Sequence, residues 1–361
     1  MDEVRITALL SALSLYAAGL IVRRMAEAGG KSDTELAMEE ARDAADLDDA
    51  RRRVSSLLAA SATSALASEW ARRSRSIAES AERHGRSLPS ATPSDVSGGA
   101  DAMRLLLGRE MSPSSIRIRT LDGAWVPFDD GWRSAVRAAA SSPERDLQTL
   151  VDRAVRTLSK DGLAVQVGNQ RPRDIVGAVR QSITDEIDRR ADRACTEAGA
   201  MVGCDAFQIS AHAQCADDHR RYQGRILTIE EYNRANRALD RPLAAGVMNC
   251  RHTKTPCFSD DRPVYSRSEL ARINATATKK VEYTLATGGK RRATVYQATQ
   301  AQRRYEARVR NVRSQRYLAR RGGLDTSAYD EQLRSLERGY DAFCAETGLD
   351  AQPDRLRVWT L

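Results

Sequence analysis

Hydrophobic positions along most of this chain recur at helical spacing. Residues 6–22 form an uncharged segment, and in residues 34–83 the apolar side chains are few and widely spaced. The second stretch contains neither proline nor glycine and carries one narrow apolar stripe, which is typical of a long helix in a loose bundle or coiled coil. Gly29-Gly30 and the following Ser32 predict a helix end and a new helix start between them. Residues 1–84 are therefore predicted to be an extended helical region.

The uncharged segment 6–22 has 17 residues, at the short limit for a membrane span. Asp2 and Glu3 precede it, whereas a signal peptide begins with a basic region. On a helix, small and polar side chains fall on one stripe, namely Thr7, Ser11, Ser14 and Ala18. We expect a helix that docks onto a partner or a neighbouring subunit, with no membrane involved. A membrane segment is the alternative.

Residues 85–100 are rich in Ser, Gly and Pro and predict a linker. A hairpin plus helices is expected for residues 101–200. Residues 116–119 alternate with period two, and Asp122-Gly123 is a hairpin turn sequence. Helical spacing follows at about 130–160 and again at 173–200, with a short extended piece at 163–167 between them.

Two further regions complete the chain. Residues 201–290 contain a strand-like Phe207–Ile209 and a capping box formed by Thr228 and Glu231, which predict a small α+β module. Residues 291–361 contain helical patterns at 294–320 and 326–347, joined by a short glycine-containing turn, which predicts an antiparallel helical hairpin. The expected fold class is mainly α.

Composition and charge narrow the class of partner. Aromatic residues make up 5% and charged residues 29% of the 361 residues, which favours thin helix–helix contacts over one thick core. The net charge is +8 with a pI near 9.3. Residues 290–321 carry eleven Lys and Arg against one acid, Glu306. Such a face favours the phosphates of double-stranded DNA, and a solvated charged face is the alternative. The residues predicted to contact DNA are Arg303, Arg304, Arg308 and Arg310.

Acids on the second helix of the hairpin should neutralise part of this basic charge. They include Asp330 and Glu337.

Histidine and cysteine concentrate in the central module. Three of the four histidines and three of the six cysteines lie between residues 212 and 257. In a large chain without a clear signal peptide, reduced thiols or metal ligation are expected before disulfides. Two separated ligand pairs suit a structural zinc ion, which would hold a loop poor in apolar residues. The predicted ligands are His212, His219, Cys250 and His252, with Cys215 and Cys257 as substitutes. Histidines hydrogen-bonded to backbone carbonyls are the alternative.

Catalytic patterns are weak in this sequence. Asp218-His219, Asn249 and His252 are the residue types of an HNH-like nuclease, but their order and spacing fit poorly. Cys250 and His252 would diverge from one another in an extended turn. The chain has no phosphate-binding glycine loop and no serine nucleophile elbow. We therefore expect a protein that is not an enzyme. A zinc-dependent nucleic-acid-binding protein or an HNH-like nuclease is the alternative.

Several short motifs, taken in order, resemble the phage minor capsid protein 2 family, relatives of Mu F-type head morphogenesis proteins. They are Ser210-Ala211-His212 with His219, Tyr222-Gln223-Gly224, Asn249-Cys250-Arg251-His252, Tyr296 to Gln300 with Gln302-Arg303, and Phe343 to Gly348. The likeness covers about residues 160–350. Cys215 and Cys257 depart from it, because the family usually has a small or basic residue and an aromatic residue there.

The resemblance implies a minor head protein of a tailed bacteriophage, present in few copies in the virion. It implies association with the portal protein, the major capsid protein and packaged DNA, with self-association as a further contact, and assembly in the host cytoplasm. It implies a role in head morphogenesis and in DNA packaging or delivery. It supplies no established catalytic residue.

Overall fold

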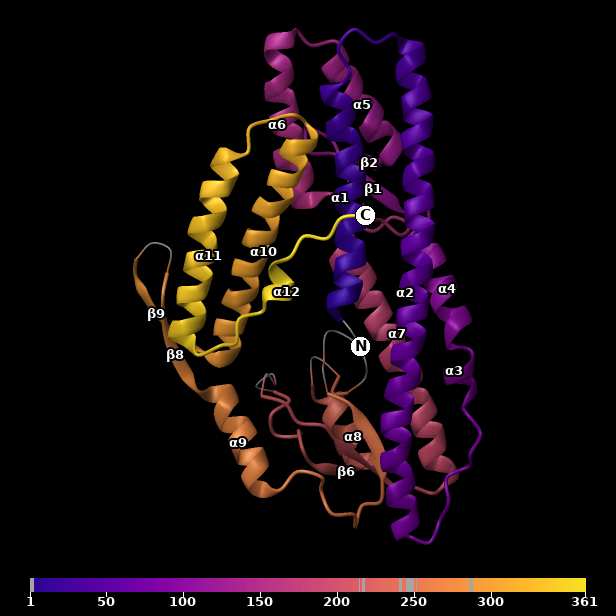
Figure 1. The fold of residues 1–361 in the computed structure, drawn as a ribbon. Helices are drawn as coiled ribbons and strands as arrows, with labels where there is room; N and C mark the ends of the chain where they lie inside the picture. The colour runs from indigo at the N-terminus through magenta and orange to yellow at the C-terminus, as the bar shows by residue number, and fades with distance from the viewer. Residues whose placement is uncertain are drawn as a thin grey trace.

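The computed structural model describes residues 3–213, 215, 218–239, 242–244, 250, 252–285 and 288–361. It is an elongated, mainly helical body with three small antiparallel sheets (Figure 1), which confirms the predicted fold class. The helices are α1 Glu3–Ala26, α2 Asp33–Arg83, α3 Ser94–Ser97, α4 Gly99–Glu110, α5 Phe128–Ala140, α6 Glu144–Asp161, α7 Ile175–Met201, α8 Ile229–Arg237, α9 Arg267–Thr278, α10 Val295–Arg321, α11 Ser327–Thr347 and α12 Pro353–Leu356. The strands are β1 Ile116–Arg119, β2 Trp125–Pro127, β3 Leu163–Val165, β4 Arg173–Asp174, β5 Ala206–Ile209, β6 Ile226–Thr228, β7 Lys254–Cys257, β8 Lys280–Thr284 and β9 Lys290–Thr294.

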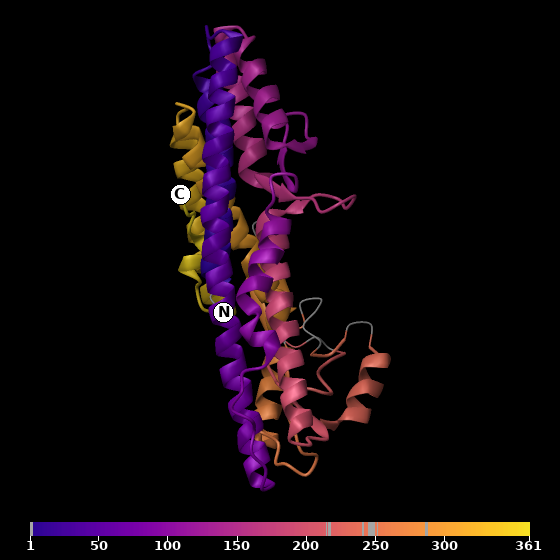
Figure 2. The same cartoon turned by 90° about the vertical axis from the view of Figure 1, so that its right-hand side faces the viewer.

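The longest element is α2, which runs along nearly the whole body (Figures 1 and 2). Its 51 residues correspond to a rod of about 77 Å at the helical rise per residue. The Ser32 side chain accepts from the Glu35 backbone N–H and the Glu35 carboxylate accepts from the Ser32 N–H, so a capping box starts the helix. The buried side chains form the narrow stripe expected from the sequence, including Leu47, Val54 and Leu58.

Helix α1 lies inside the bundle, in contact with α2, α5, α6, α7 and α10. Its apolar face supplies buried side chains to the largest core cluster, among them Leu10, Leu13 and Ile21. By length and composition Val4–Ala26 is apolar enough to cross a membrane, but 61% of its apolar 18-residue stretch is buried within the fold.

The stripe that the sequence assigned to a partner subunit faces elements of the same chain. Ala18 is buried, and the Ser14 hydroxyl accepts a hydrogen bond of 2.8 Å from the Leu163 N–H. The prediction that Ser14 and Ala18 contact a partner subunit was therefore wrong, because α5, α6, α7 and α10 of the same chain pack against α1. Thr7 and Ser11 remain partly exposed.

A four-stranded sheet of order β2-β1-β3-β4 packs beside α5 and α6. Strands β1 and β2 form the hairpin predicted from Asp122-Gly123, with Ile118 opposite Val126. Gly123 has a φ of +98°, a conformation that glycine adopts without a steric penalty.

The segment expected to be a linker is partly helical. Helix α3 lies within residues 85–100, and α4 begins at Gly99. The Asp95 carboxylate accepts from the Arg193 guanidinium of α7 at 2.7 Å, and Arg190 of α7 donates to the Asp95 carbonyl at 2.9 Å. These contacts fix α3 on α7, so the Ser/Gly/Pro-rich stretch does not separate two bodies.

The predicted C-terminal hairpin is confirmed as α10 and α11. Arg313 pairs with Glu337 at 2.6 Å and Arg316 with Asp330 at 2.7 Å, so acids of α11 neutralise part of α10 as expected. Leu318 at the end of α10 is buried in the main core. The hairpin therefore packs against the helical body.

A ribbon of β8 and β9 precedes α10, and the sequence did not predict it. Tyr283 of β8 meets Phe343 of α11 edge to face, with ring centroids 4.8 Å apart. This contact helps to fix the ribbon on the hairpin.

The central module forms the remaining part of the molecule, beside the ends of α2 and α7 (Figure 2). Its sheet has the order β6-β5-β7, and α8 follows β6 through the capping box predicted at Thr228 and Glu231. The Asp261 carboxylate accepts from Ser80 and from Arg83 of α2. The module is thus attached to one end of the long helix.

Candidate metal centre

The sheet of the central module brings the two predicted ligand pairs together. Strands β5 and β7 are antiparallel, so the end of β5 lies beside the start of β7, with Ile209 opposite Lys254. Ser210 N–H donates to the Thr253 carbonyl, and Thr253 N–H donates to the Ser210 hydroxyl, both at 2.9 Å. These two hydrogen bonds consequently hold the loop after β5 and the segment before β7 side by side.

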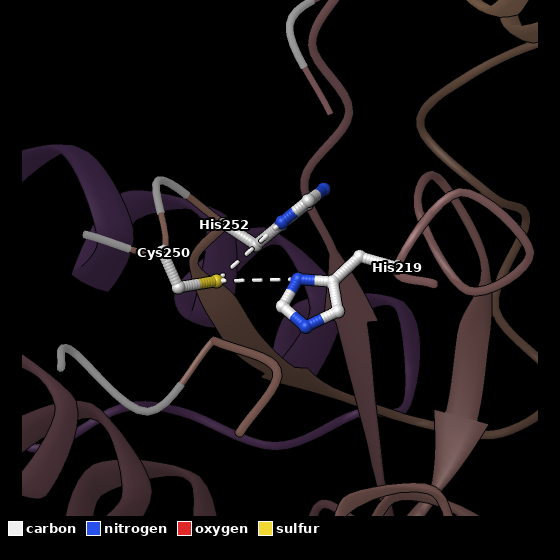
Figure 3. Close-up of side chains that lie close together, drawn as sticks. All are labelled: His219, Cys250 and His252. Atoms are coloured by element: carbon white, nitrogen blue, oxygen red, sulfur yellow. Dashed lines mark hydrogen bonds between the residues drawn. The ribbon is translucent and has the colours of Figure 1, made fainter. Parts of the chain in front are cut away.

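Three side chains converge beyond this point, and Figure 3 shows the sulfur of Cys250 facing both imidazole rings. The Cys250 Sγ lies 3.7 Å from His219 Nδ1 and 3.6 Å from His252 Nδ1. One sulfur and one nitrogen on a tetrahedral zinc ion, with bonds of about 2.3 Å and 2.0–2.1 Å, would stand about 3.6 Å apart. The sulfur–nitrogen spacings therefore match two edges of a zinc tetrahedron. His219 and His252 are each 3% exposed.

The outer nitrogens of the two histidines face oxygen atoms. His252 Nε2 is 3.3 Å from Gln223 Oε1, and His219 Nε2 is 3.9 Å from Asp218 Oδ2. Since an amide oxygen accepts, the Nε2 proton is favoured on His252, which leaves its Nδ1 lone pair aimed at the sulfur. A cation bound to the sulfur and to both Nδ1 atoms would have three protein ligands.

Burial sets the ionisation of the site. It lowers the pKa of His252 to about 3, with the proximity of His212 and His219 adding to the effect, so this ring is neutral and can donate its lone pair. Burial also raises the pKa of the Cys250 thiol, and the Ala244 N–H that donates to its sulfur at 3.4 Å opposes the rise. A metal would replace the thiol proton here, since thiolate is the ligating form.

The other predicted ligands occupy different positions. The His212 ring lies against His252, with centroids 4.4 Å apart and ring planes tilted by 38°. Cys215 is buried in the loop between His212 and His219. Cys257 lies at the far end of β7, opposite Ala206, five residues and about 16 Å of extended chain beyond His252. Asn249 and Arg251 of the sequence motifs lie outside the described residues.

Gln223 supports the cluster, although sequence reasoning gave it no role. Its side chain is 0% exposed, and its Oε1 accepts from the His212 backbone N–H at 3.0 Å as well as facing His252. Its Nε2 donates to Asn274 Oδ1 of α9 at 2.6 Å. The available signal was its place in the Tyr-Gln-Gly motif between the histidine pairs.

The four arginines predicted to contact DNA divide into two pairs. Arg304 and Arg308 are exposed on α10. Arg303 and Arg310 are partly buried, and both line a cavity with α1 and α7. Burial lowers the pKa of Arg310, whose Nη1 donates to the Arg355 carbonyl. The helical periodicity could not separate the pairs, because the cavity that Arg303 and Arg310 line is completed by α1 and α7, which are distant in the sequence.

The fold is thus an elongated helical body with a small module in which His and Cys side chains converge. The model of the phage minor capsid protein 2 family matches residues 128–345, from α5 to the last turn of α11, and the chain belongs to this family. It is thus a bacteriophage minor capsid protein, a component of the virion. Comparison with curated proteins and with solved structures finds no significant match.

Proposed function

We propose that this protein acts at the portal and the inner capsid of a tailed phage head, in head morphogenesis and in DNA packaging or delivery. The observation that carries the proposal is the family match, which spans the central module and most of the C-terminal hairpin. Portal protein and major capsid protein are the proposed partners, and self-association is a further proposed contact. Assembly takes place in the host cytoplasm.

Zinc is the proposed cofactor, and its role is structural. His219, Cys250 and His252 would supply three ligands, and His212, beside His252, is the proposed fourth. Among the described residues of the module, the hydrophobic cluster consists of six buried side chains, which include Phe207, Ile209 and Leu227. A metal joining the two loops would add the stability that so small a core lacks.

Packaged DNA is the proposed ligand of the exposed basic surface. Arg304 and Arg308 lie one helical turn apart on α10 and can meet neighbouring phosphates. The ribbon that leads into α10 adds exposed Lys280, Arg291 and Arg292. These side chains can neutralise phosphates without reading the base sequence, as a packaged genome requires.

An HNH-like nuclease remains the competing function for the same histidines. A hydrolytic metal centre keeps one coordination position open for water or substrate. The near-complete burial of His219 and His252 supports a closed structural site instead. Metal-dependent nicking of duplex DNA by the purified protein, lost in His219→Ala, would support the nuclease.

Infection with a phage from which this gene has been removed tests the proposed function. We expect particles with defective or unfilled heads, and rescue by the wild-type protein supplied from a plasmid. Density for the protein at the junction of portal and capsid in rescued particles is the second expected result. Filled, infectious particles without the protein would contradict a role in morphogenesis and packaging.

A further inference from the structure

A crevice runs along α1, between that helix, the start of α7, helix α10 and the chain after α12. It consists of two neighbouring cavities of about 290 and 460 Å³. Both are lined by Thr7, Ser11, Asp174, Val176, Arg310 and Arg357, so they form one continuous space. The two hydroxyls belong to the small polar stripe of α1, and Ser14 of the same stripe lines the larger cavity.

The walls of this crevice are strongly basic. Six guanidinium groups line it, and they come from α7, α10, α12 and the residue that follows α12: Arg180, Arg303, Arg308, Arg310, Arg355 and Arg357. Three carboxylates share the space, namely Asp174, Glu306 and Asp354. The guanidiniums thus exceed the carboxylates, and a partly enclosed space strengthens their field over that of an open surface.

The carboxylates are engaged in local contacts. Asp174 accepts from the Gly177 N–H at 2.7 Å and caps α7. Asp354 pairs with Arg357 at 3.3 Å. Glu306 is nearly fully buried, 3.9 Å from Arg355, and burial raises its pKa. The charges of Glu306 and Asp174 also act on Arg310, whose Nη1 donates to the Arg355 carbonyl.

The charges around Arg310 are unequal in number. It is an inward-facing residue of α10, and its neighbouring charges are two carboxylates, Glu306 and Asp174, and two cations, Arg180 and Arg355. Three guanidiniums against two carboxylates leave an excess of positive charge in one partly buried space, and a bound anion would offset it. Each guanidinium offers several N–H donors in one plane, and the hydroxyls of Thr7 and Ser11 add further donors from the opposite wall.

We propose that this crevice binds a phosphate group, held by Arg310, Arg180 and Arg357 with the hydroxyls of Thr7 and Ser11. A phosphate presents several acceptor oxygens and more than one negative charge, which suits donors that converge from three helices better than a carboxylate does. The phosphate comes either from solution as the free ion or from the backbone of a nucleic acid. The site is separate from the exposed pair Arg304 and Arg308, apart from the shared edge at Arg308.

Titration calorimetry on the full-length protein tests the site, with inorganic phosphate as one probe and a short single-stranded oligonucleotide as the other. We expect saturable binding of one or both. Arg310→Gln and Arg357→Gln should each weaken it about tenfold or more, since each removes a charge-assisted contact. Arg104→Gln on the exposed surface of α4, outside the crevice, is the matched control and should leave the affinity unchanged.

The two probes identify the source. If inorganic phosphate binds and the crevice variants weaken that binding, the ligand is the free ion. If only the oligonucleotide binds, and the same variants weaken its binding, the ligand is the nucleic-acid backbone. Arg357 has a side chain that is 58% exposed, so its variant should remain folded even where Arg310→Gln does not. The proposal is overturned if neither probe binds, or if a folded Arg357→Gln variant binds as tightly as the wild type. Arg304 lies outside the crevice, and its contribution is measured separately on duplex DNA.

Discussion

Arg24 of α1 and Asp43 of α2 form a two-point ion pair inside the helical body. Arg24 Nε donates to Asp43 Oδ2 at 2.9 Å, and Arg24 Nη2 donates to Asp43 Oδ1 at 3.0 Å. Trp132 of α5 donates its indole N–H to Oδ2 of the same carboxylate at 2.9 Å. Asp43 is 0% exposed, so one buried carboxylate joins three helices.

Replacing this carboxylate should therefore destabilise the protein severely. Asp43→Ala leaves the Trp132 donor and two Arg24 nitrogens buried without their acceptor, while Arg24 Nη1 keeps Glu39 and Glu27. The loss should lower the free energy of unfolding by about 2–4 kcal/mol. Urea denaturation followed by circular dichroism measures the change. Asp49→Ala removes an exposed carboxylate of the same helix, paired with Arg53, and should cost less than about 1 kcal/mol. Equal effects of the two substitutions would contradict the assigned role of Asp43.

The predicted zinc site distinguishes Cys250, a ligand, from Cys257, which is not one. Protein purified without a polyhistidine tag should contain about one zinc per chain by elemental analysis. Cys250→Ser should lower the zinc content strongly, whereas Cys257→Ser should retain it, since Cys257 lies at the other end of β7. A chelator should lower the melting temperature of the wild type and not that of Cys250→Ser. A metal-free wild-type protein that is folded and insensitive to chelator would rule out the site.

Asp188 predicts a pH-dependent stability. Burial, with smaller contributions from nearby carboxylates, raises its pKa from 3.8 to about 6. Between pH 4 and 6 the folded protein therefore holds a proton that the unfolded chain has lost, so this group makes the protein less stable as the pH rises through that range. Above pH 6 the folded protein bears the full free-energy cost of a buried charged carboxylate. Asp188→Asn removes that cost and should add about 1–3 kcal/mol to the free energy of unfolding at pH 7–8.

The gain from Asp188→Asn should shrink as the pH falls from 6 to 4. Chemical denaturation at a series of pH values follows it. Asp101→Asn, at an exposed position of α4, serves as the control and should change stability by less than about 0.5 kcal/mol at any pH. A gain independent of pH would show that the carboxyl of Asp188 is not the cause.

Arg304 and Arg308 carry the DNA prediction. Changing both to Gln should weaken binding to duplex DNA similarly for any base sequence, because phosphate contacts hold no sequence information. Each lost contact should reduce the slope of log K against log salt by about 0.9. Arg104→Gln combined with Arg234→Gln removes two exposed arginines elsewhere and should leave the slope unchanged. A slope unaltered by the α10 substitutions would mean that α10 faces protein.

The attachment of the central module to α7 depends on a glycine. A Cβ atom at Gly199 would lie 2.3 Å from Pro256 Cβ of β7, so Gly199→Ala must push the module away from α7. We expect a loss of about 1–3 kcal/mol in stability and faster proteolysis of the module. Gly108→Ala in α4 meets no atom within 4 Å and should stabilise the protein by about 0.5–1 kcal/mol through helix propensity. Equal proteolysis of the two variants would count against the close contact.

Local patterns predicted the elements of this fold well. The narrow apolar stripe of 34–83 predicted α2, Asp122-Gly123 predicted the first hairpin, and the glycine turn near 322 predicted α10 and α11. Each of these signals depends on residues close in sequence. The ribbon β8–β9 was missed because Lys280, Arg291 and Arg292 dominate its strands and apolar alternation is short there.

Long-range packing could not be predicted in the same way. The stripe of α1 indicated that something covers it, but its covering partners include α10, almost 300 residues later in the sequence. The same distance conceals the burial of Arg310. For the metal centre, the clustering of His and Cys indicated the right segment, and only the pairing of β5 with β7 places Cys250 between His219 and His252 while leaving Cys257 remote.

Helix α2 has a mechanical consequence. It is bonded to α1 and α5 at Asp43 and to the central module at Ser80 and Arg83, and the 37 residues between Asp43 and Ser80 rise by about 56 Å. No proline or glycine interrupts this span, so it has no built-in hinge. A load applied to one attachment therefore reaches the other along a stiff strut, which keeps the helical body and the central module at a set separation.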